Sequence, residues 1–193
     1  MFTGIVEELG MIQGISKRGA VTLLCVQAAK IPDGVKIGDS VAVNGVCLTV
    51  VKHDRSSIQV EMMPETAAGT NLGLLKMSER VNLERSLKLG DRISGHFVSG
   101  HIDCVGVIRR KSRLRGNLCV DIAVPPGGIS YIVRKGSIAV DGISLTIVEK
   151  RSNVFSVYII PHTMQNTTVM FKGPSDRVNI EFDLLMKRVA AEE

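Results

Sequence analysis

The chain has 193 residues, 45% of them hydrophobic, and carries a formal net charge of +5 at pH 7. It contains no apolar run of roughly 18 residues, which excludes a membrane-spanning helix, and no leader pattern, so we expect no secretory signal. Nineteen glycines and few aromatic residues favour a turn-rich β protein, and the four cysteines without a CxxC pair indicate reduced thiols in a cytosolic protein.

The first half of the chain reads as short strands separated by turns. Met1–Ile12 is expected to form a strand that Gly4 interrupts, and Val21–Ala28 returns after a turn at 17–19. Ser40–Lys52 predicts a hairpin, because Asn44-Gly45 lies between two alternating apolar runs and both turn residues need positive φ. Strands at 58–63 and 81–84 follow, with a helical segment between them at 66–77.

The hairpin sequence occurs twice. Ser40–Val50 aligns with Ser137–Ile147 at an offset of 97 residues, and six of the eleven positions are identical. Three further blocks align in the same order at offsets of 96 or 97 residues: 3–7 with 99–103, 64–66 with 161–163, and 80–84 with 177–181. The chain is therefore interpreted as a duplicated domain, with copies at 1–96 and 97–182 and a tail at 183–193.

The second copy repeats the order of elements. Its opening strand is expected at 97–109, followed by a basic hairpin loop at 109–116 and strands at 117–124 and 154–160, with a short helix or 3₁₀ turn at 130–133. The tail reads as a helix capped by Asp183, with Leu185 and Val189 on one face as a hint of an oligomer contact. About six short strands per copy indicate a Greek-key barrel or a sandwich.

Polar residues at matching positions of the two copies are the candidates for chemistry. Cys47 aligns with Ser144, Thr49 with Thr146, Thr3 with Ser99 and Glu65 with His162. Hydroxyl groups at these positions could equally satisfy local backbone groups. His101 replaces an apolar residue of the first copy, and a histidine suits proton transfer, although a lone histidine is also a common surface residue.

Five motifs together resemble the riboflavin synthase family of duplicated lumazine-binding enzymes. They are MFTGIVE at 1–7, NGVCLT at 44–49, SGHID at 99–103, DGISLT at 141–146 and IPHT at 160–163. The resemblance implies a mainly β fold of two tandem six-stranded Greek-key barrels with a short C-terminal α-helix, assembled as a homotrimer. It implies a four-carbon transfer between two molecules of 6,7-dimethyl-8-ribityllumazine, which yields riboflavin and 5-amino-6-(ribitylamino)uracil without a metal or an organic cofactor.

The family's ligand-binding positions carry over to two sets of residues, one for each barrel. The first-barrel set is Gly4, Ile5, Val6, Cys47, Leu48, Thr49, Glu61, Met62, Met63, Pro64, Glu65 and Thr66. The second-barrel set is Gly100, His101, Ile102, Lys135, Ser144, Leu145, Thr146, Tyr158, Ile159, Ile160, Pro161, His162 and Thr163. Each reacting pair is expected between the first barrel of one subunit and the second barrel of a neighbour.

The resemblance also places Phe2, Thr3, Ser40 and Asp183 near the reaction. Our hypothesis gives His101 a proton-transfer or polarising role, with Ser144 and Thr146 bonding the ring of one substrate. Cys47, Ser40 or an activated water would supply or assist the nucleophile at the other ring. Backbone groups beside Gly4 and Gly100 would bind the pterin edge.

Two other functions compete with this interpretation. A non-enzymatic lumazine or flavin carrier would share the duplication but lose reactive residues in one half, whereas both halves keep them here. A nucleic-acid-binding tandem barrel is suggested only by the positive charge, and the scarcity of aromatic residues argues against it. We expect a cytoplasmic enzyme with no nucleic-acid or membrane partner, which a lumazine synthase capsid could enclose.

Overall fold

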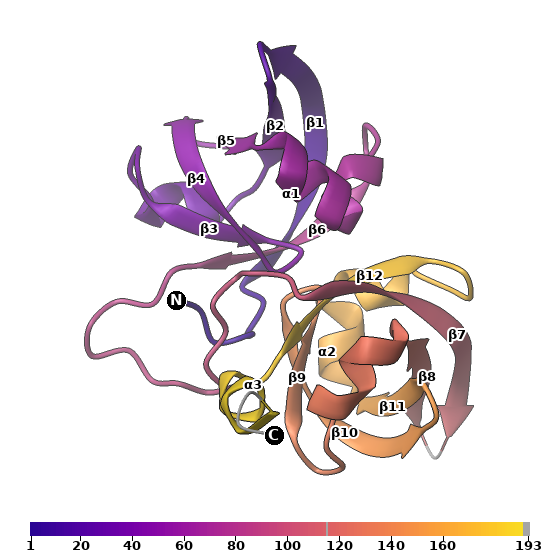
Figure 1. Ribbon diagram of the computed structural model, residues 1–193. Coiled ribbons are helices and arrows are strands. Elements are labelled where there is room, and N and C mark those ends of the chain that lie inside the picture. The colour runs from indigo at the N-terminus through magenta and orange to yellow at the C-terminus, as the bar shows by residue number, and fades with distance from the viewer. Residues whose placement is uncertain (115, 191–193) are drawn as a thin grey trace.

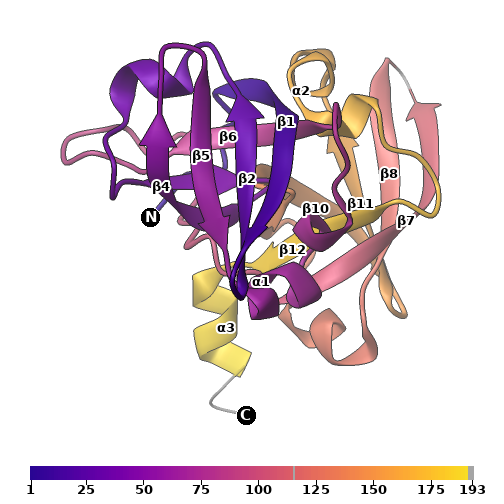
Figure 2. The ribbon, with the colours of Figure 1, turned by 90° about the horizontal axis from the view of Figure 1, so that it is seen from above.

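The computed structural model describes residues 1–114 and 116–190 and contains two β-barrels joined by an extended linker (Figure 1). Figure 2 shows the barrels side by side when seen from above, with the C-terminal helix projecting to one side of them. We call residues 86–103, between the last strand of the first barrel and the first strand of the second, the linker.

Each barrel is a closed antiparallel sheet of six strands. The first contains β1 (Glu8–Arg18), β2 (Val21–Gln27), β3 (Ser40–Val43), β4 (Val46–His53), β5 (Ser57–Met62) and β6 (Arg80–Arg85). The second contains β7 (Cys104–Leu114), β8 (Asn117–Ala123), β9 (Ser137–Val140), β10 (Ile143–Arg151), β11 (Val154–Ile159) and β12 (Arg177–Phe182). Both follow the order first-second-fifth-fourth-third-sixth, and the sixth strand pairs with the first to close the ring. Of the two architectures left open by the strand pattern, the barrel is correct.

Each barrel has its own hydrophobic core, because alternate residues of each strand point inward. Leu24, Val50 and Val60 are among the fully buried residues of the first core, and Phe155, Val157 and Ile180 are among those of the second. A third, small cluster of Phe2, Ala42, Val98 and Ala139 lies apart from both cores and combines residues of the two copies. The two barrels are therefore independent cores joined by a short apolar seam.

The two predicted hairpin turns are confirmed, and they touch each other. Asn44 and Asp141 have φ of 44° and 47°, and Gly45 and Gly142 have φ of 79° and 76°. A Cβ atom built on Gly45 would lie 2.6 Å from the backbone nitrogen of Gly142, so only glycine fits at this contact.

Asparagine side chains join the barrels around these turns. The Asn82 amide donates to the carbonyl oxygen of Asp141 (2.8 Å), and the Asn179 amide donates to the carbonyl oxygen of Asn44 (2.9 Å). All four residues are buried. Because a buried polar group without a partner is costly, this reciprocal network fixes how one barrel sits on the other.

Short helices follow the fifth strand of each barrel. α1 (Pro64–Gly69) and α2 (Pro161–Gln165) each have proline at the first helical position, where its missing N–H costs nothing. The helical segment expected at 66–77 is instead α1 followed by a 3₁₀ turn, η2 (Asn71–Leu74). Two more 3₁₀ turns, η1 (Ile31–Gly34) and η4 (Thr168–Met170), connect strands, and η3 (Pro126–Tyr131) takes the place of the expected turn at 130–133.

The predicted tail helix is α3 (Leu184–Ala190), and residues 191–193 of that prediction lie outside the described residues. The Asp183 carboxylate accepts a hydrogen bond from the Leu185 backbone N–H (2.9 Å), as its predicted capping role requires. Leu185 and Val189 are 72% and 56% exposed, so no residue of the described part of the chain covers this apolar face of α3.

Three sequence predictions are wrong. The first strand of each barrel begins at Glu8 and Cys104, not at Met1 and Phe97, because the preceding segments bond to the other copy. The basic stretch at 109–116 is not a loop, since β7 continues to Leu114; Arg115 lies outside the described residues. Pairing with β8 keeps this stretch extended.

The four cysteines, Cys25, Cys47, Cys104 and Cys119, are all free, as predicted for reduced thiols. Burial raises the pKa of the Cys104 thiol to about 11, which keeps that side chain neutral. Across the described ranges, the helices are too short and too polar to cross a bilayer.

Candidate functional site

The segments that open the two copies cross over to the opposite barrels. The Gly4 carbonyl oxygen accepts a hydrogen bond from the Ser144 backbone N–H of β10 (2.8 Å). In the same way, the Gly100 carbonyl oxygen accepts one from the Cys47 N–H of β4 (2.9 Å). Val6 packs against the second core and Ile102 against the first. Each hairpin is therefore lined by the opening segment of the other copy.

Each opening segment is anchored by a glutamate from the barrel of the same copy. Glu84 of β6 accepts hydrogen bonds from the Thr3 N–H (2.6 Å), the Thr3 hydroxyl (2.7 Å) and the Gly4 N–H (3.0 Å). Glu181 of β12 accepts the equivalent bonds from Ser99 and Gly100, at 2.6, 2.7 and 2.9 Å. Burial raises the pKa of Glu84, although its hydrogen bonds act in the opposite direction.

The glycine of each opening segment is required by close backbone approach. Gly4 and Gly100 have φ of +77° and +86°. A Cβ atom on Gly4 would lie 2.7 Å from Cβ of Ser144, and one on Gly100 would lie 2.5 Å from Cβ of Cys47. The sequence pattern predicted only that Gly4 interrupts a strand, so the close approach at both glycines is a finding of the structure.

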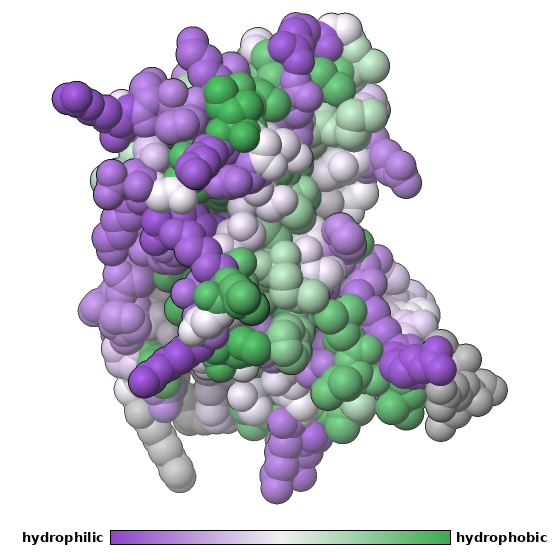
Figure 3. Space-filling model, turned by 90° about the vertical axis from the view of Figure 1, so that its left-hand side faces the viewer, coloured by the Kyte–Doolittle hydropathy of each residue, from purple (hydrophilic) through white to green (hydrophobic). Residues whose placement is uncertain are grey.

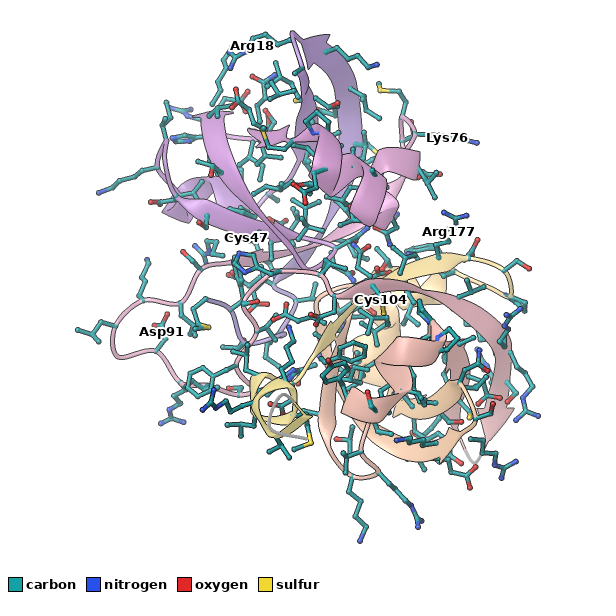
Figure 4. All side chains as sticks on the ribbon, in the orientation of Figure 1. Arg18, Cys47, Lys76, Asp91, Cys104 and Arg177 are labelled. Atoms are coloured by element: carbon teal, nitrogen blue, oxygen red, sulfur yellow. The ribbon has the colours of Figure 1, made fainter. Side chains whose placement is uncertain are left out.

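The first-barrel face combines the β3–β4 hairpin, the end of β5 and the start of α1. Thr49 pairs with Ser40 on one side and with Glu61 on the other, so these three expected residues are neighbours. The Glu61 carboxylate forms an ion pair with Arg18. Cys47 is half-buried in front of Gly100, and Figure 4 shows it at the lower edge of the first barrel, where the linker passes. Thr49, Met63, Pro64 and Glu65 are exposed, so this face is open to solvent.

The second-barrel face repeats this arrangement with different side chains. Thr146 pairs with Ser137, and the neighbouring Ile147 pairs with Val157, which brings Tyr158 to the same edge. Four residues of this face are exposed: Tyr158, Ile160, Pro161 and His162. In the first barrel, three of the four equivalent residues are also exposed. Lys135 is exposed, with φ of 68°, one residue before Gly136 at the entry to β9.

The expected grouping of these residues into two sets is therefore wrong in one respect. Gly4, Ile5 and Val6 lie with Ser144 on the second barrel, and Gly100, His101 and Ile102 lie with Cys47 on the first. Alignment of the copies assigns each segment to its own half, whereas the crossing depends on contacts between the halves. It follows that His101 shares a face with Cys47 and Thr49, not with Ser144 and Thr146.

Three other predicted residues have defined places. Phe2 is fully buried in the seam between the barrels, and its backbone bridges to Val98. The Thr3 hydroxyl is committed to Glu84. Both residues hold the opening segment in position. The His101 side chain is exposed, and its backbone N–H bonds to the Ser99 hydroxyl (3.1 Å).

The sequence analysis missed His96. Its Nδ1 atom lies 2.7 Å from the Ser144 hydroxyl oxygen, and its backbone N–H donates to the Thr3 carbonyl oxygen (3.1 Å). Burial lowers the pKa of His96 below its ordinary value of 6.5, while the charges of Asp183 and Glu181 oppose that shift. No sequence pattern pointed to this residue, because His96 lies between the aligned blocks and has no counterpart within them.

Comparisons with known proteins agree with this architecture. The model of the Lumazine binding domain family matches residues 3–86 and 99–183. The riboflavin synthase of Actinobacillus pleuropneumoniae is 42% identical over 189 residues, covering 98% of this chain and 88% of that protein. The riboflavin synthase of Bacillus subtilis (strain 168) is 41% identical over 187 residues, covering 97% and 87%.

Solved structures with the same fold include crystal structures of LumP with bound ligands. The complex of LumP with riboflavin superposes with a TM-score of 0.87 at 25% sequence identity, covering 94% of this chain and 99% of that chain. The complex of LumP with flavin mononucleotide gives a TM-score of 0.84 at 26% identity, with the same coverage.

Proposed function

The chain belongs to the lumazine-binding domain family together with the riboflavin synthases, and from that premise we propose that it catalyses the riboflavin synthase reaction. The enzyme transfers a four-carbon unit from one molecule of 6,7-dimethyl-8-ribityllumazine to a second molecule of the same compound. The products are riboflavin and 5-amino-6-(ribitylamino)uracil.

The observation that carries this proposal is the pair of crossed faces. Two identical substrates must take opposite roles, one as donor and one as acceptor. The faces share the hydrogen bonds from a hairpin to a glycine carbonyl, yet one presents Cys47 and His101 and the other presents Ser144 and His96. Two related sites with different side chains suit a dismutation better than they suit the carriage of one ligand.

The openness of both faces supports assembly across subunits. Met63 on the first face, Ile160 on the second and Ile5 beside it are 58%, 57% and 44% exposed. Figure 3 views the side that carries the linker and shows hydrophobic side chains across its middle and lower part. A homotrimer, in which the first face of one subunit covers the second face of a neighbour, would remove these groups from water, and α3 would supply a further contact.

The assembly would also accelerate the reaction. Holding two rings face to face replaces a bimolecular encounter by an effectively unimolecular step, an effect worth ~7–11 kcal/mol in favourable cases. Each subunit would contribute one ring of the pair, so a free monomer would bind substrate without converting it.

On the first face, His101 would take or polarise a proton of the acidic 7-methyl group of one lumazine. Cys47, Ser40 or a water activated there would supply or assist the nucleophile at the other ring. On the second face, Ser144 and Thr146 would hydrogen-bond the other ring. The pterin edges would meet backbone groups beside Gly100 on the first face and beside Gly4 on the second. The enzyme would act in the cytoplasm, and a lumazine synthase capsid is the enclosing partner we propose for it.

The test supplies the purified protein with 6,7-dimethyl-8-ribityllumazine as the sole substrate. We expect riboflavin absorbance and fluorescence to appear, with one riboflavin formed for every two lumazines consumed. A lumazine that binds but stays unchanged would identify a carrier instead. Sedimentation of the same sample tests the trimer, and a catalytically active monomer would refute the shared site.

A further inference from the structure

His96 brings an imidazole to the second face through the linker. Its Nδ1 atom lies 2.7 Å from the Ser144 hydroxyl oxygen. The adjacent Gly95 is equally close, since a Cβ atom there would lie 2.9 Å from Cβ of Ser144 and 2.1 Å from the Thr3 carbonyl oxygen. The linker is therefore packed directly onto the β9–β10 hairpin, and the bond from the His96 backbone N–H to the Thr3 carbonyl oxygen (3.1 Å) holds the histidine in place.

The first face lacks this feature. Cys47 occupies the position equivalent to Ser144, and within the described residues its thiol makes no side-chain hydrogen bond. The linker contacts Cys47 through Gly100 and Ser144 through Gly95 and His96, but only the bond from His96 to Ser144 joins two side chains. The two halves therefore have the same crossed backbone bonds, but only the hairpin side chain of the second, Ser144, has a side-chain partner in the linker.

The groups around His96 determine the protonation state of the imidazole that bonds to Ser144. Glu181 is committed to Ser99 and Gly100, and Asp183 caps α3, so neither carboxylate is bonded to the imidazole. A half-buried imidazole without a carboxylate partner is neutral at neutral pH, with one nitrogen as donor and the other as acceptor. The Ser144 hydroxyl can donate and accept, and the bond to Nδ1 takes one of these two roles and leaves the other for a ligand.

We propose that His96 is a positioning residue of the second-barrel face, which fixes the direction of the Ser144 hydroxyl and so sets ligand affinity there without acting on the first-barrel face. The proposal rests on the proposed function in that the ligand is a lumazine or a flavin. Because it concerns binding, it is tested with riboflavin itself, without any need for turnover.

The decisive comparison uses two amide variants. The amide of asparagine reaches the position of Nδ1, whereas that of glutamine reaches the position of Nε2. We expect His96→Asn to bind riboflavin within about threefold of the wild type. His96→Gln and His96→Leu are expected to weaken one of two classes of binding sites by about tenfold and to leave the other class unchanged. Titration of riboflavin fluorescence resolves the two classes.

A double-mutant cycle with Ser144→Ala separates positioning from general damage. If His96 acts through Ser144, the variant carrying both His96→Leu and Ser144→Ala binds no more weakly than Ser144→Ala alone. The control is His53→Leu, since His53 is an exposed residue at the end of β4, and it should leave both classes unchanged. Urea unfolding of each variant verifies that it is folded.

The opposite results would overturn the proposal. One such result is an equal loss of riboflavin affinity in His96→Asn and His96→Gln. Another is a double variant that binds more weakly than Ser144→Ala alone. The third is weaker binding at both classes of site. If His96→Leu does not fold, the comparison of asparagine with glutamine still decides. A wild-type protein that binds riboflavin in two classes but forms none from lumazine would refute the proposed function and leave this inference standing.

Discussion

The two barrels have the same backbone and different chemistry. Both follow one strand order, both turn through an adjacent pair of positive-φ residues, and both anchor an opening segment on a buried glutamate. They differ in the side chains around the two faces, where Cys47 aligns with Ser144 and Gly38 aligns with Lys135. The two copies therefore share their turns and their glutamate anchors, whereas the side chains on the two faces differ.

A second difference lies away from the faces. In the second barrel, the Lys111 ammonium donates to the carbonyl oxygens of Val169, Met170 and Lys172, at 2.8, 3.1 and 2.7 Å. The equivalent residue of the first barrel is Ile15, which borders a groove of about 610 Å³ beneath α1. In the second barrel this position is therefore occupied by a charged group bonded to backbone carbonyls, whereas in the first barrel it is an apolar residue beside an open groove.

The largest expected effect comes from removing an anchor. Glu181→Ala leaves three donors of Ser99 and Gly100 without their partner, and we expect the free energy of unfolding to fall by about 3 kcal/mol. Glu84→Ala should cost a similar amount, because its contacts match. Urea unfolding measures both, and a twofold difference between them would show that the two anchors are not equivalent.

The next effect concerns the face that carries His101. His101→Ala should lower kcat about 100-fold, equivalent to about 2.7 kcal/mol, with little change in the free energy of unfolding, since the side chain is exposed. Steady-state kinetics with the lumazine measures it, and His53→Ala is the control. Wild-type turnover in His101→Ala would remove the proton-transfer role.

The contact between the turns gives a third prediction. Gly45→Ala places a Cβ atom 2.6 Å from the Gly142 backbone at positive φ, and we expect a loss of about 2 kcal/mol. Gly19→Ala is a matched control, because Gly19 has φ of +62° but nothing within 4 Å of a Cβ atom. It should cost about 1 kcal/mol. Equal losses in urea unfolding would mean that the turns do not press on each other.

The difference at Lys111 predicts a smaller effect. Lys111→Met makes the second barrel resemble the first and removes three hydrogen bonds from a half-buried ammonium, whose pKa burial already lowers. We expect a loss of about 1 kcal/mol, measured by urea unfolding. Ile15→Met in the first barrel is the control and should change the value by less than about 0.5 kcal/mol.

The smallest effect is a pH dependence of stability that comes from His96. Because the folded state lowers the pKa of His96, the unfolded chain binds its proton more readily, and stability falls as the pH drops below 6.5. Replacement of His96 by Asn should remove this part of the dependence. Unfolding curves between roughly pH 5 and pH 8 measure it, and an unchanged profile in the variant would assign the dependence to other groups.

The duplication, both hairpins, most strand positions and the cap of the last helix could be predicted from the sequence. Each of these depends on neighbours in the chain: Asn44-Gly45 and Asp141-Gly142 need positive φ, and Asp183 bonds two residues ahead. Alternating apolar residues place the strands because their side chains must face one core.

Which segment lines which face could not be predicted, because it depends on contacts between the two copies. Strand β1 begins at Glu8 because residues before it bond to Glu84 and to Ser144, far along the chain, and no local pattern encodes such a contact. The pairing of His96 with Ser144 has the same origin. Local chemistry fixes how the chain turns, whereas the packing of one barrel on the other fixes which side chains meet.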